Sequence, residues 1–350
     1  MPKNPMLKHE GEGTERHDQI LANIIGKFPI ELAPKIPTLD KPLIINCAYP
    51  GWQPRMWPRK ELYRGNLPHN YEEGGVRYPA VPQTIEQQVA DLVEAAKAGC
   101  ASVHVHPRDP MDSFASESLK LVKEVYDRVF EQTDVISLQH TWKRTDSGDI
   151  DYIEDTEELL KLGNGNKYCQ AALVLWPTAD SYTKNYDEDA RNGVLYMQEH
   201  KVKPIIKIRS HYHLKRMKRA LIDTKVLNTE PLVIIHDVGH PFGWPMDVDP
   251  WMPIELISTI MHTKAEFPDA LTGVFVGYRN WMPITMTAIL AGVDMVQIGI
   301  EDCYWMYPHK DEVIQRNIDA VSKITTFCEL IGREIATVDK ARKILGVVRT

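Results

Sequence analysis

Cysteine is scarce in this sequence and follows no recognisable spacing. The 350 residues contain five cysteines, which are widely scattered and form no Cys-x-x-Cys pair. Such an odd and dispersed set predicts neither a disulfide framework nor a Cys-x-x-Cys metal or redox motif. We therefore expect reduced thiols and a cytoplasmic protein.

Long apolar runs and an excess of basic charge are also absent. No apolar stretch approaches the length of a membrane span, and the formal net charge is -7. The first absence predicts a soluble protein without a membrane partner. The second argues against nucleic-acid binding, which normally needs a concentrated basic face, so an acidic substrate must be held by individual arginines.

Residues 1–41 lack the apolar core of a signal peptide. They are polar and punctuated by proline, so neither secretion nor import into an organelle is predicted. We expect an N-terminal arm that packs on the surface or on a neighbouring subunit, followed by one catalytic domain over residues 42–350. A homo-oligomer, either a dimer or a tetramer, is the expected assembly.

The rest of the chain contains a regular alternation of short apolar strands and helices. Expected strands cover residues 43–49, 102–107, 135–141, 168–176, 204–210, 232–238, 272–278 and 295–300. Expected helices cover residues 84–99, 116–133, 152–162, 188–200, 214–226, 253–267, 284–291 and 311–331. Eight strand-helix units predict an α/β fold, a (β/α)8 TIM barrel with an N-terminal extension and C-terminal helices. An open doubly wound sheet is the alternative, which the lack of a Gly-x-Gly-x-x-Gly turn after the first strand disfavours.

A His-x-His motif marks the end of the second expected strand. Because side chains two residues apart on a strand point to the same face, His104 and His106 should project together and converge on one ion. The last expected strand ends in two adjacent carboxylates, Glu301 and Asp302, which alternation points in different directions. In a TIM barrel the active site lies at the C-terminal ends of the strands, where both pairs fall.

Other polar side chains gather at the same predicted end of the barrel. They lie near the ends of the third, fifth and sixth strands and just after the seventh: His140, Thr141, Arg209, His236, Asp237 and Arg279. We interpret Arg209 and Thr141 as contacts for a carboxylate or phosphate, with a structural salt bridge as the alternative for Arg209. His236 is more typical of a hydrogen-bonded buried histidine than of a catalyst, and we leave it out of the site.

Two imidazoles and one carboxylate are typical of a catalytic zinc site, in which a fourth position stays open. We therefore expect His104, His106 and Glu301 to bind Zn2+ or another divalent transition metal. Such an ion is a Lewis acid that polarises a ketone and holds an enolate oxygen. Asp302 is then the expected base for an acidic C–H proton, and Arg279 is expected to orient that carboxylate or stabilise its charge.

In their order along the chain, these motifs resemble the β-keto acid cleavage enzymes, a family that includes 3-keto-5-aminohexanoate cleavage enzyme. The resemblance spans roughly residues 41–346. It rests on Pro-Leu-Ile-Ile at 42–45, His-Val-His-Pro-Arg-Asp at 104–109, Gly-Tyr-Arg-Asn-Trp at 277–281, Gly-Ile-Glu-Asp at 299–302, and Ile-Gly-Arg-Glu-Ile-Ala-Thr at 331–337. It implies a zinc-dependent (β/α)8 barrel in which His104, His106 and Glu301 match the zinc ligands, Asp302 the base and Arg279 its charged partner.

The resemblance also implies a reaction between a β-keto acid and acetyl-CoA. The enolate of the keto acid would attack the thioester carbonyl, and coenzyme A would then move to the ketone of the substrate. A retro-Claisen step would release acetoacetate and a new acyl-CoA.

Departures from the family pattern bear on the substrate. Gln53 stands where the aminohexanoate-cleaving member has an acidic residue suited to an amine, and His140 and Thr141 open a charged segment in place of Ser-Thr-Gly-Gly. The loop at residues 51–83 is longer than the family's usual loop, and we interpret it as a lid or an oligomer contact. We expect a different keto acid, anionic or aromatic at its far end, with Gln53, His140, Thr141 and Arg209 among its contacts.

Two other functions fit parts of the pattern. A metal-dependent hydrolase of the amidohydrolase type would combine the His-x-His motif with His211, His236 and Asp302. In amidohydrolases, however, the His-x-His motif lies on the first strand, whereas here it lies on the second. Glu301 would also be left without a role. A noncatalytic barrel that binds a metal or an acyl-CoA would take up metal without turning over any keto acid.

Overall fold

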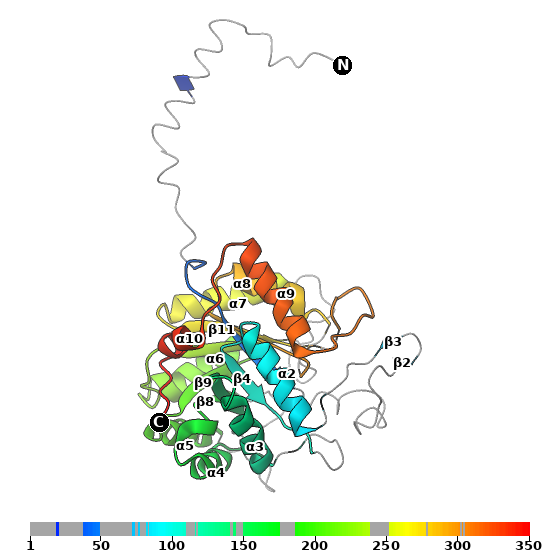
Figure 1. The fold of residues 1–350 in the computed structure, drawn as a ribbon. Coiled ribbons are helices and arrows are strands. Elements are labelled where there is room, and N and C mark those ends of the chain that lie inside the picture. Colours follow the sequence, from blue (N-terminus) through cyan, green and yellow to red (C-terminus); the bar gives the residue numbers. More distant parts are fainter. Residues whose placement is uncertain are drawn as a thin grey trace, which may run out of the picture. The chain divides into compact units, whose positions relative to one another are not determined.

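Eight parallel strands close into a barrel in the computed structural model (Figure 1). The strands are β1 (Ile44–Tyr49), β4 (Ser102–Val105), β5 (Ile136–His140), β8 (Ala171–Leu175), β9 (Lys203–Ile208), β10 (Val233–Val238), β11 (Leu271–Val276) and β12 (Met295–Ile298). Around the ring they follow the order β1-β12-β11-β10-β9-β8-β5-β4, and β4 pairs with β1 to close it. The (β/α)8 TIM barrel predicted from the sequence is confirmed.

The structure describes residues 19–20, 38–49, 72–73, 76–77, 82, 84–109, 116, 118–140, 143–144, 150–175, 186–238, 252–277, 279–301, 303 and 305–350. Residues 38–350 form one compact unit. Nearly all of the N-terminal arm and most of the loop at residues 51–83 lie outside the described residues. What we expect of them remains a prediction.

Helices follow most of the strands. They are α2 (Ile85–Lys97), α3 (Leu119–Phe130), α4 (Glu154–Gly163), α5 (Tyr186–Glu199), α6 (His211–Met217), α7 (Met252–Glu266), α8 (Trp281–Leu290), α9 (Asn317–Leu330) and α10 (Val338–Leu345). The sequence pattern did not predict the 3-10 turn η5 (Asn166–Tyr168), the π-helical turn η6 (Lys218–Ile222), or two short ribbons, β2 (Glu72–Glu73) with β3 (Val76–Arg77) and β6 (Lys143–Arg144) with β7 (Ile150–Asp151). No helix in the described part of the chain is long and apolar enough to cross a membrane.

Helix α9 begins later than the sequence pattern predicts. We expect a helix from residue 311, but α9 begins at Asn317. The chain before it doubles back, since Trp305 and Val313 form an antiparallel bridge. A carboxylate oxygen of Asp319 accepts the backbone N–H of Arg316 at 3.0 Å, which caps the helix at that point.

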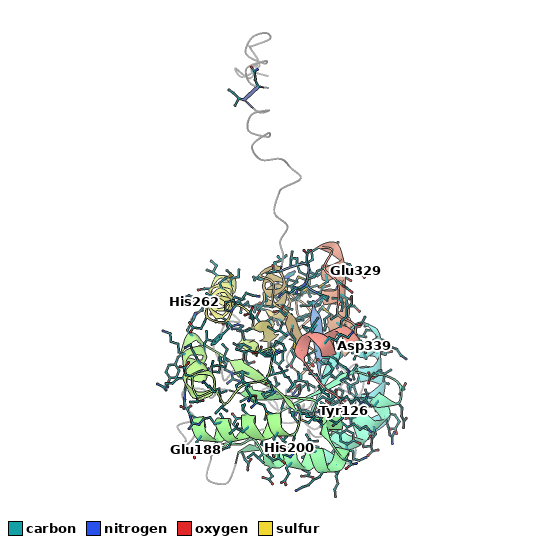
Figure 2. The ribbon with its side chains drawn as sticks, turned by 90° about the vertical axis from the view of Figure 1, so that its left-hand side faces the viewer. Tyr126, Glu188, His200, His262, Glu329 and Asp339 are labelled. Carbon is teal, nitrogen blue, oxygen red and sulfur yellow. The ribbon has the colours of Figure 1, made fainter. Side chains whose placement is uncertain are left out.

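Apolar side chains fill the barrel at the N-terminal ends of its strands. The interior cluster contains Ile44, Ile136, Leu138, Ala171, Leu173, Ile205, Val233, Ile235, Phe275 and Met295. Helix α10, on which Asp339 is labelled in Figure 2, adds Ala341 and Leu345 to the same cluster. This helix therefore covers the N-terminal end of the barrel, and the opposite end carries the polar side chains that form the candidate site.

Candidate metal centre

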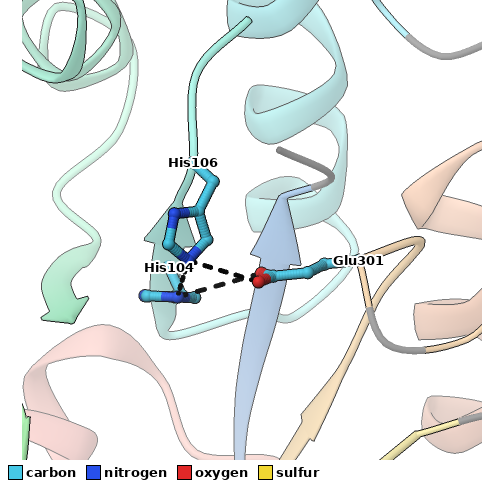
Figure 3. Close-up of side chains that lie close together, drawn as sticks. All are labelled: His104, His106 and Glu301. Carbon is cyan, nitrogen blue, oxygen red and sulfur yellow. Dashed lines mark hydrogen bonds and ion pairs between the residues drawn. The ribbon is translucent and has the colours of Figure 1, made fainter. Parts of the chain in front are cut away.

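Three side chains converge at the C-terminal end of the barrel (Figure 3). The Nε2 atoms of His104 and His106 lie 2.9 Å apart, and their rings are perpendicular. The Glu301 carboxylate places one oxygen 3.3 Å from Nε2 of His106 and the other 3.8 Å from Nε2 of His104. Within the described residues, these three form the one group of histidine, cysteine or carboxylate side chains whose ligand atoms lie close enough to hold a metal ion.

The barrel topology brings these distant residues together. His104 lies on β4, and His106 follows one residue after that strand ends. Glu301 follows β12, and both strands pair with β1 on its two sides. The expectation that Glu301 lies on the last strand is wrong, because β12 ends at Ile298 and Glu301 sits in the turn that follows.

Gly299 makes that turn possible. Its φ of +149° lies in the region that favours glycine, and a Cβ at this position would lie 2.2 Å from the backbone oxygen of Ala48. The chain can therefore leave the barrel wall immediately after β12 and return Glu301 toward the two histidines.

A buried hydrogen-bond chain anchors the same turn. The side-chain oxygen of Asn317 accepts the Ile300 N–H at 2.8 Å. Asn317 donates its own backbone N–H and its side-chain amide to the two carboxylate oxygens of Asp91. Burial raises the pKa of Asp91 to about 6, although the hydrogen bonds from Asn317 act in the opposite direction. Residues on α2 and α9 thus position the turn that carries Glu301.

The protonation of the two histidines is set by their surroundings. Nδ1 of His104 lies 2.9 Å from the Leu138 carbonyl, which can only accept, so this nitrogen carries the proton and Nε2 keeps its lone pair. Burial lowers the pKa of His104 to about 4, and it lowers the pKa of His106 well below the ordinary value. Both imidazoles are therefore neutral at pH 7, which is the form that binds metals.

The separations within the triad suit a tetrahedral ion. Ligand bonds of 2.0–2.1 Å in tetrahedral geometry place ligand atoms about 3.3 Å apart. The separation of 2.9 Å between the two Nε2 atoms and that of 3.3 Å between Nε2 of His106 and the nearer Glu301 oxygen lie close to that value. The other Glu301 oxygen lies 3.8 Å from Nε2 of His104. A carbonyl that fixes the tautomer of a ligating histidine is also typical of metal sites, so the residues fit a divalent ion with one coordination position left for substrate.

A second charged cluster lies at the same end of the barrel, on β9 and β10. Nζ of Lys207 is 3.1 Å from one carboxylate oxygen of Asp237, and Nε of Arg209 donates to the other at 2.6 Å. The sequence pattern indicated Arg209 and Asp237 as candidate site residues but not Lys207. Lys207 could have been found from the sequence, because it is a lysine inside an apolar strand. It lies two residues before Arg209 and therefore on the same face of the strand.

The other predicted site residues are placed as follows. Arg279 donates to the Lys310 carbonyl at 2.9 Å and to the Asp311 carboxylate at 2.7 Å, with its guanidinium 4.3 Å from the centre of a Trp305 ring. His140 ends β5, but its side chain is not described. Gln53, Thr141 and Asp302 lie outside the described residues.

His236 lies on the other face of β10 from Asp237. It is buried, and its pKa is lowered to about 3 by burial first and then by the nearby charges of His211 on α6 and Lys264 on α7. Both of those neighbours lie on helices that pack outside the barrel, so His236 faces the helices rather than the barrel interior. An amidohydrolase-type site would need this histidine near His104 and His106, and the fold separates them.

Known proteins that are similar to this chain in sequence are β-keto acid cleavage enzymes and acetyl-CoA-dependent transferases. A family model described as beta-keto acid cleavage enzyme matches residues 75–347, a range that contains the whole triad. The 3-keto-5-aminohexanoate cleavage enzyme of Fusobacterium nucleatum subsp. nucleatum is 24% identical over 277 residues, covering 77% of this chain and 92% of that protein. The 3-dehydrocarnitine:acetyl-CoA trimethylamine transferase of Rhizobium meliloti is 26% identical over 292 residues, with 77% and 91% covered. The 3-oxoadipate:acetyl-CoA acetyltransferase of Cupriavidus necator is 25% identical over 289 residues, with 81% and 92% covered.

Proposed function

We propose, since this chain belongs to the beta-keto acid cleavage enzyme family, that it condenses a β-keto acid with acetyl-CoA and releases acetoacetate and a new acyl-CoA. The observation that carries the proposal is the convergence of His104, His106 and Glu301 at the C-terminal end of a closed barrel. That is where TIM-barrel enzymes place their active sites.

His104, His106 and Glu301 are the proposed ligands of a divalent ion, with zinc favoured by two imidazoles and one carboxylate. When bound, the ion supplies a Lewis acid that polarises the ketone and stabilises negative charge on oxygen. The protein's own contribution is to hold the three ligand atoms in place. The Leu138 carbonyl orients His104, and Asn317 secures the turn before Glu301.

Asp302 is the proposed base, because it is adjacent to the proposed ligand Glu301. It takes a proton from the carbon between the ketone and the carboxylate, and that carbon then bonds to the thioester carbonyl of acetyl-CoA. The coenzyme A thiolate leaves and bonds to the substrate's ketone carbon. The bond between that carbon and the attacking carbon breaks, and the acetoacetate carbanion recovers the proton from Asp302.

Arg279 is the proposed charged partner of Asp302. Its contacts with Asp311 and Trp305 hold the guanidinium just beyond the end of β11, which gives it a defined position. Gln53, His140, Thr141 and Arg209 are the proposed substrate contacts. Arg209 is supported by its position at the same end of the barrel, where its side chain is 13% exposed, and by its pairing with Asp237.

The proposal is tested by incubating metal-loaded protein with acetyl-CoA and a panel of β-keto acids, and following acetoacetate and new acyl-CoA by mass spectrometry. We expect both products from at least one keto acid, and their loss in Glu301→Gln and Asp302→Asn. Glu329→Gln on α9 and Asp339→Asn on α10, both labelled in Figure 2, are the matched controls, since both residues are exposed and neither is a proposed site residue. Metal uptake without any product would instead support a noncatalytic binding barrel.

A further inference from the structure

The charged cluster at the ends of β9 and β10 is largely shielded from solvent and holds two cations for one anion. The side chains of Asp237, Lys207 and Arg209 are 0%, 6% and 13% exposed. Asp237 is the one carboxylate among the described residues that pairs with either cation. Two cations therefore share a single anion in a poorly hydrated place, where a net charge is costly unless a further anion compensates it.

The two terminal nitrogens of the Arg209 guanidinium are available to bind a ligand. Its guanidinium donates through Nε to Asp237, and no hydrogen bond joins either terminal nitrogen to a described residue. An arginine held through Nε presents a planar pair of N–H donors, the arrangement that binds a carboxylate with two parallel hydrogen bonds. Asp237 thus positions the guanidinium, and the outward edge is left for a ligand.

The cluster and the metal triad lie on opposite sides of the barrel. The triad residues lie on or just after β4 and just after β12, and these two strands flank β1. Lys207 lies on β9, and Arg209 follows its last residue. In the ring order, β9 is four strands from β1 in either direction, so it is diametrically opposite. Nζ of Lys207 lies 5.4 Å from the centre of the Phe275 ring, which belongs to the interior cluster, so Lys207 points into the barrel. The two sites therefore face each other across one small interior.

This arrangement restricts which part of the reactants reaches the cluster. In a β-keto acid the carboxylate is separated from the ketone by a single carbon, so it stays beside the triad when the ketone is there. The phosphates of acetyl-CoA are far from its thioester, at the other end of the pantetheine arm. The group that can reach Arg209 is the far end of the keto acid.

Resting on the proposed function, we propose that Arg209, supported by Lys207 and Asp237, binds a second carboxylate at the far end of the substrate. The substrate class is then a β-keto dicarboxylic acid, and Arg209 determines the specificity. Asp237 is a positioning residue, because it acts through the guanidinium.

The test uses two keto acids of equal chain length and metal-loaded protein. 3-Oxoadipate carries the distal carboxylate, and 3-oxohexanoate carries a methyl group in its place. We expect wild type to prefer 3-oxoadipate in kcat/KM, and the ratio between the two substrates to fall at least ~100-fold in Arg209→Met, as for other sites that lose a charged hydrogen-bond partner. Arg209→Lys should restore part of the ratio. An unchanged ratio in Arg209→Met would overturn the inference. It would show that Arg209 binds the carboxylate that both substrates share, or that it only stabilises the fold.

Arg216→Met is the matched control. Arg216 also donates through Nε to an aspartate, Asp187, at 2.7 Å, but it lies on α6 outside the barrel. Its substitution removes an arginine-aspartate pair of the same geometry and should leave the substrate ratio unchanged. A fall in the ratio as large as that in Arg209→Met would contradict the assignment.

A binding experiment separates this inference from the proposed function. Adipate and hexanoate, which cannot react, are titrated into wild type, Arg209→Met and Arg216→Met, with heat of binding as the readout. We expect adipate to bind wild type and Arg216→Met but not Arg209→Met, and hexanoate to bind none of them comparably. This result supports the anion site even if no keto acid yields acetoacetate. Equal binding of both acids, or adipate binding that survives Arg209→Met, would overturn it even if acetoacetate is formed.

Discussion

The Nε2 atoms of His104 and His106 face each other at 2.9 Å, and burial prevents either ring from becoming charged at neutral pH. Because the Leu138 carbonyl fixes the proton of His104 on Nδ1, the lone pair of its Nε2 points at the neighbouring ring. Without a metal, His106 can satisfy that lone pair by donating from its own Nε2. Metal binding then requires His106 to carry its proton on Nδ1 instead, so that three acceptor atoms surround the ion.

The first prediction concerns metal content. Wild type should bind one divalent ion per chain, and His104→Ala and Glu301→Gln should each weaken binding more than ~100-fold, since loss even of an outer partner costs 10–100-fold. Metal content after dialysis, measured by inductively coupled plasma mass spectrometry, checks this. His309→Ala, at an exposed position, is the control and should keep its metal. Full occupancy in Glu301→Gln would contradict the ligand set.

The second prediction concerns Asn317, which touches neither histidine. Asn317→Ala removes the acceptor for the Ile300 N–H and leaves the Asp91 carboxylate without its amide partner. Metal affinity should fall ~10–100-fold, as for other residues that position a ligand, and stability by about 1–3 kcal/mol. Metal titration and urea denaturation measure the two effects. Asn228→Ala, at an exposed position, should change neither, and unaltered affinity in Asn317→Ala would remove the proposed positioning role.

The third prediction concerns the pH dependence of stability. The pKa of Asp91 is raised to about 6 in the folded protein, mainly by burial, from an ordinary value near 3.8. Between these values the folded state holds more protons than the unfolded state, so the contribution of Asp91 is full below pH 4 and is lost as pH rises through 6. Asp91→Asn stays neutral, so its stability relative to wild type should rise by an amount on the order of 2 kcal/mol between pH 4.5 and pH 7.5.

Urea denaturation of metal-free wild type and Asp91→Asn at several pH values between 4.5 and 7.5 measures this difference. Loss of the carboxylate as an acceptor for Asn317 adds a constant offset, which does not affect the slope with pH. A flat difference for Asp91→Asn would mean that the carboxylate is ionised over the whole range.

The fourth prediction contrasts two glycines with positive φ. Gly299→Ala would place a Cβ 2.2 Å from the Ala48 oxygen, whereas a Cβ at Gly332 meets no atom within 4 Å. Gly332→Ala should therefore cost only ~1–2 kcal/mol of left-handed strain. Gly299→Ala should cost clearly more and also lower metal affinity, because the turn before Glu301 must move. Equal losses of stability, measured by urea denaturation, would contradict the close approach.

Much of the fold could be predicted from the sequence, because each barrel strand is a short apolar run that ends in polar residues. The pairing of His104 with His106 follows from the two-residue period of a strand alone. The position of Glu301 could be predicted only in part, since a glycine turn and not the strand directs it. The partnership of Lys207 with Asp237 depends on the register between β9 and β10, and the contact of Arg279 with Asp311 depends on a loop; neither leaves a periodic signal.

The most direct test of the proposed reaction follows the carbon skeleton. Metal-loaded protein is incubated with unlabelled acetyl-CoA and 3-oxoadipate carrying 13C at the carboxyl carbon next to the carbon that is deprotonated. Carbon NMR then locates the label in the products. The proposed reaction predicts acetoacetate labelled at its carboxyl carbon, together with an unlabelled acyl-CoA formed from the rest of the substrate. Unlabelled acetoacetate, or labelled acetate formed without any transfer to coenzyme A, would contradict it.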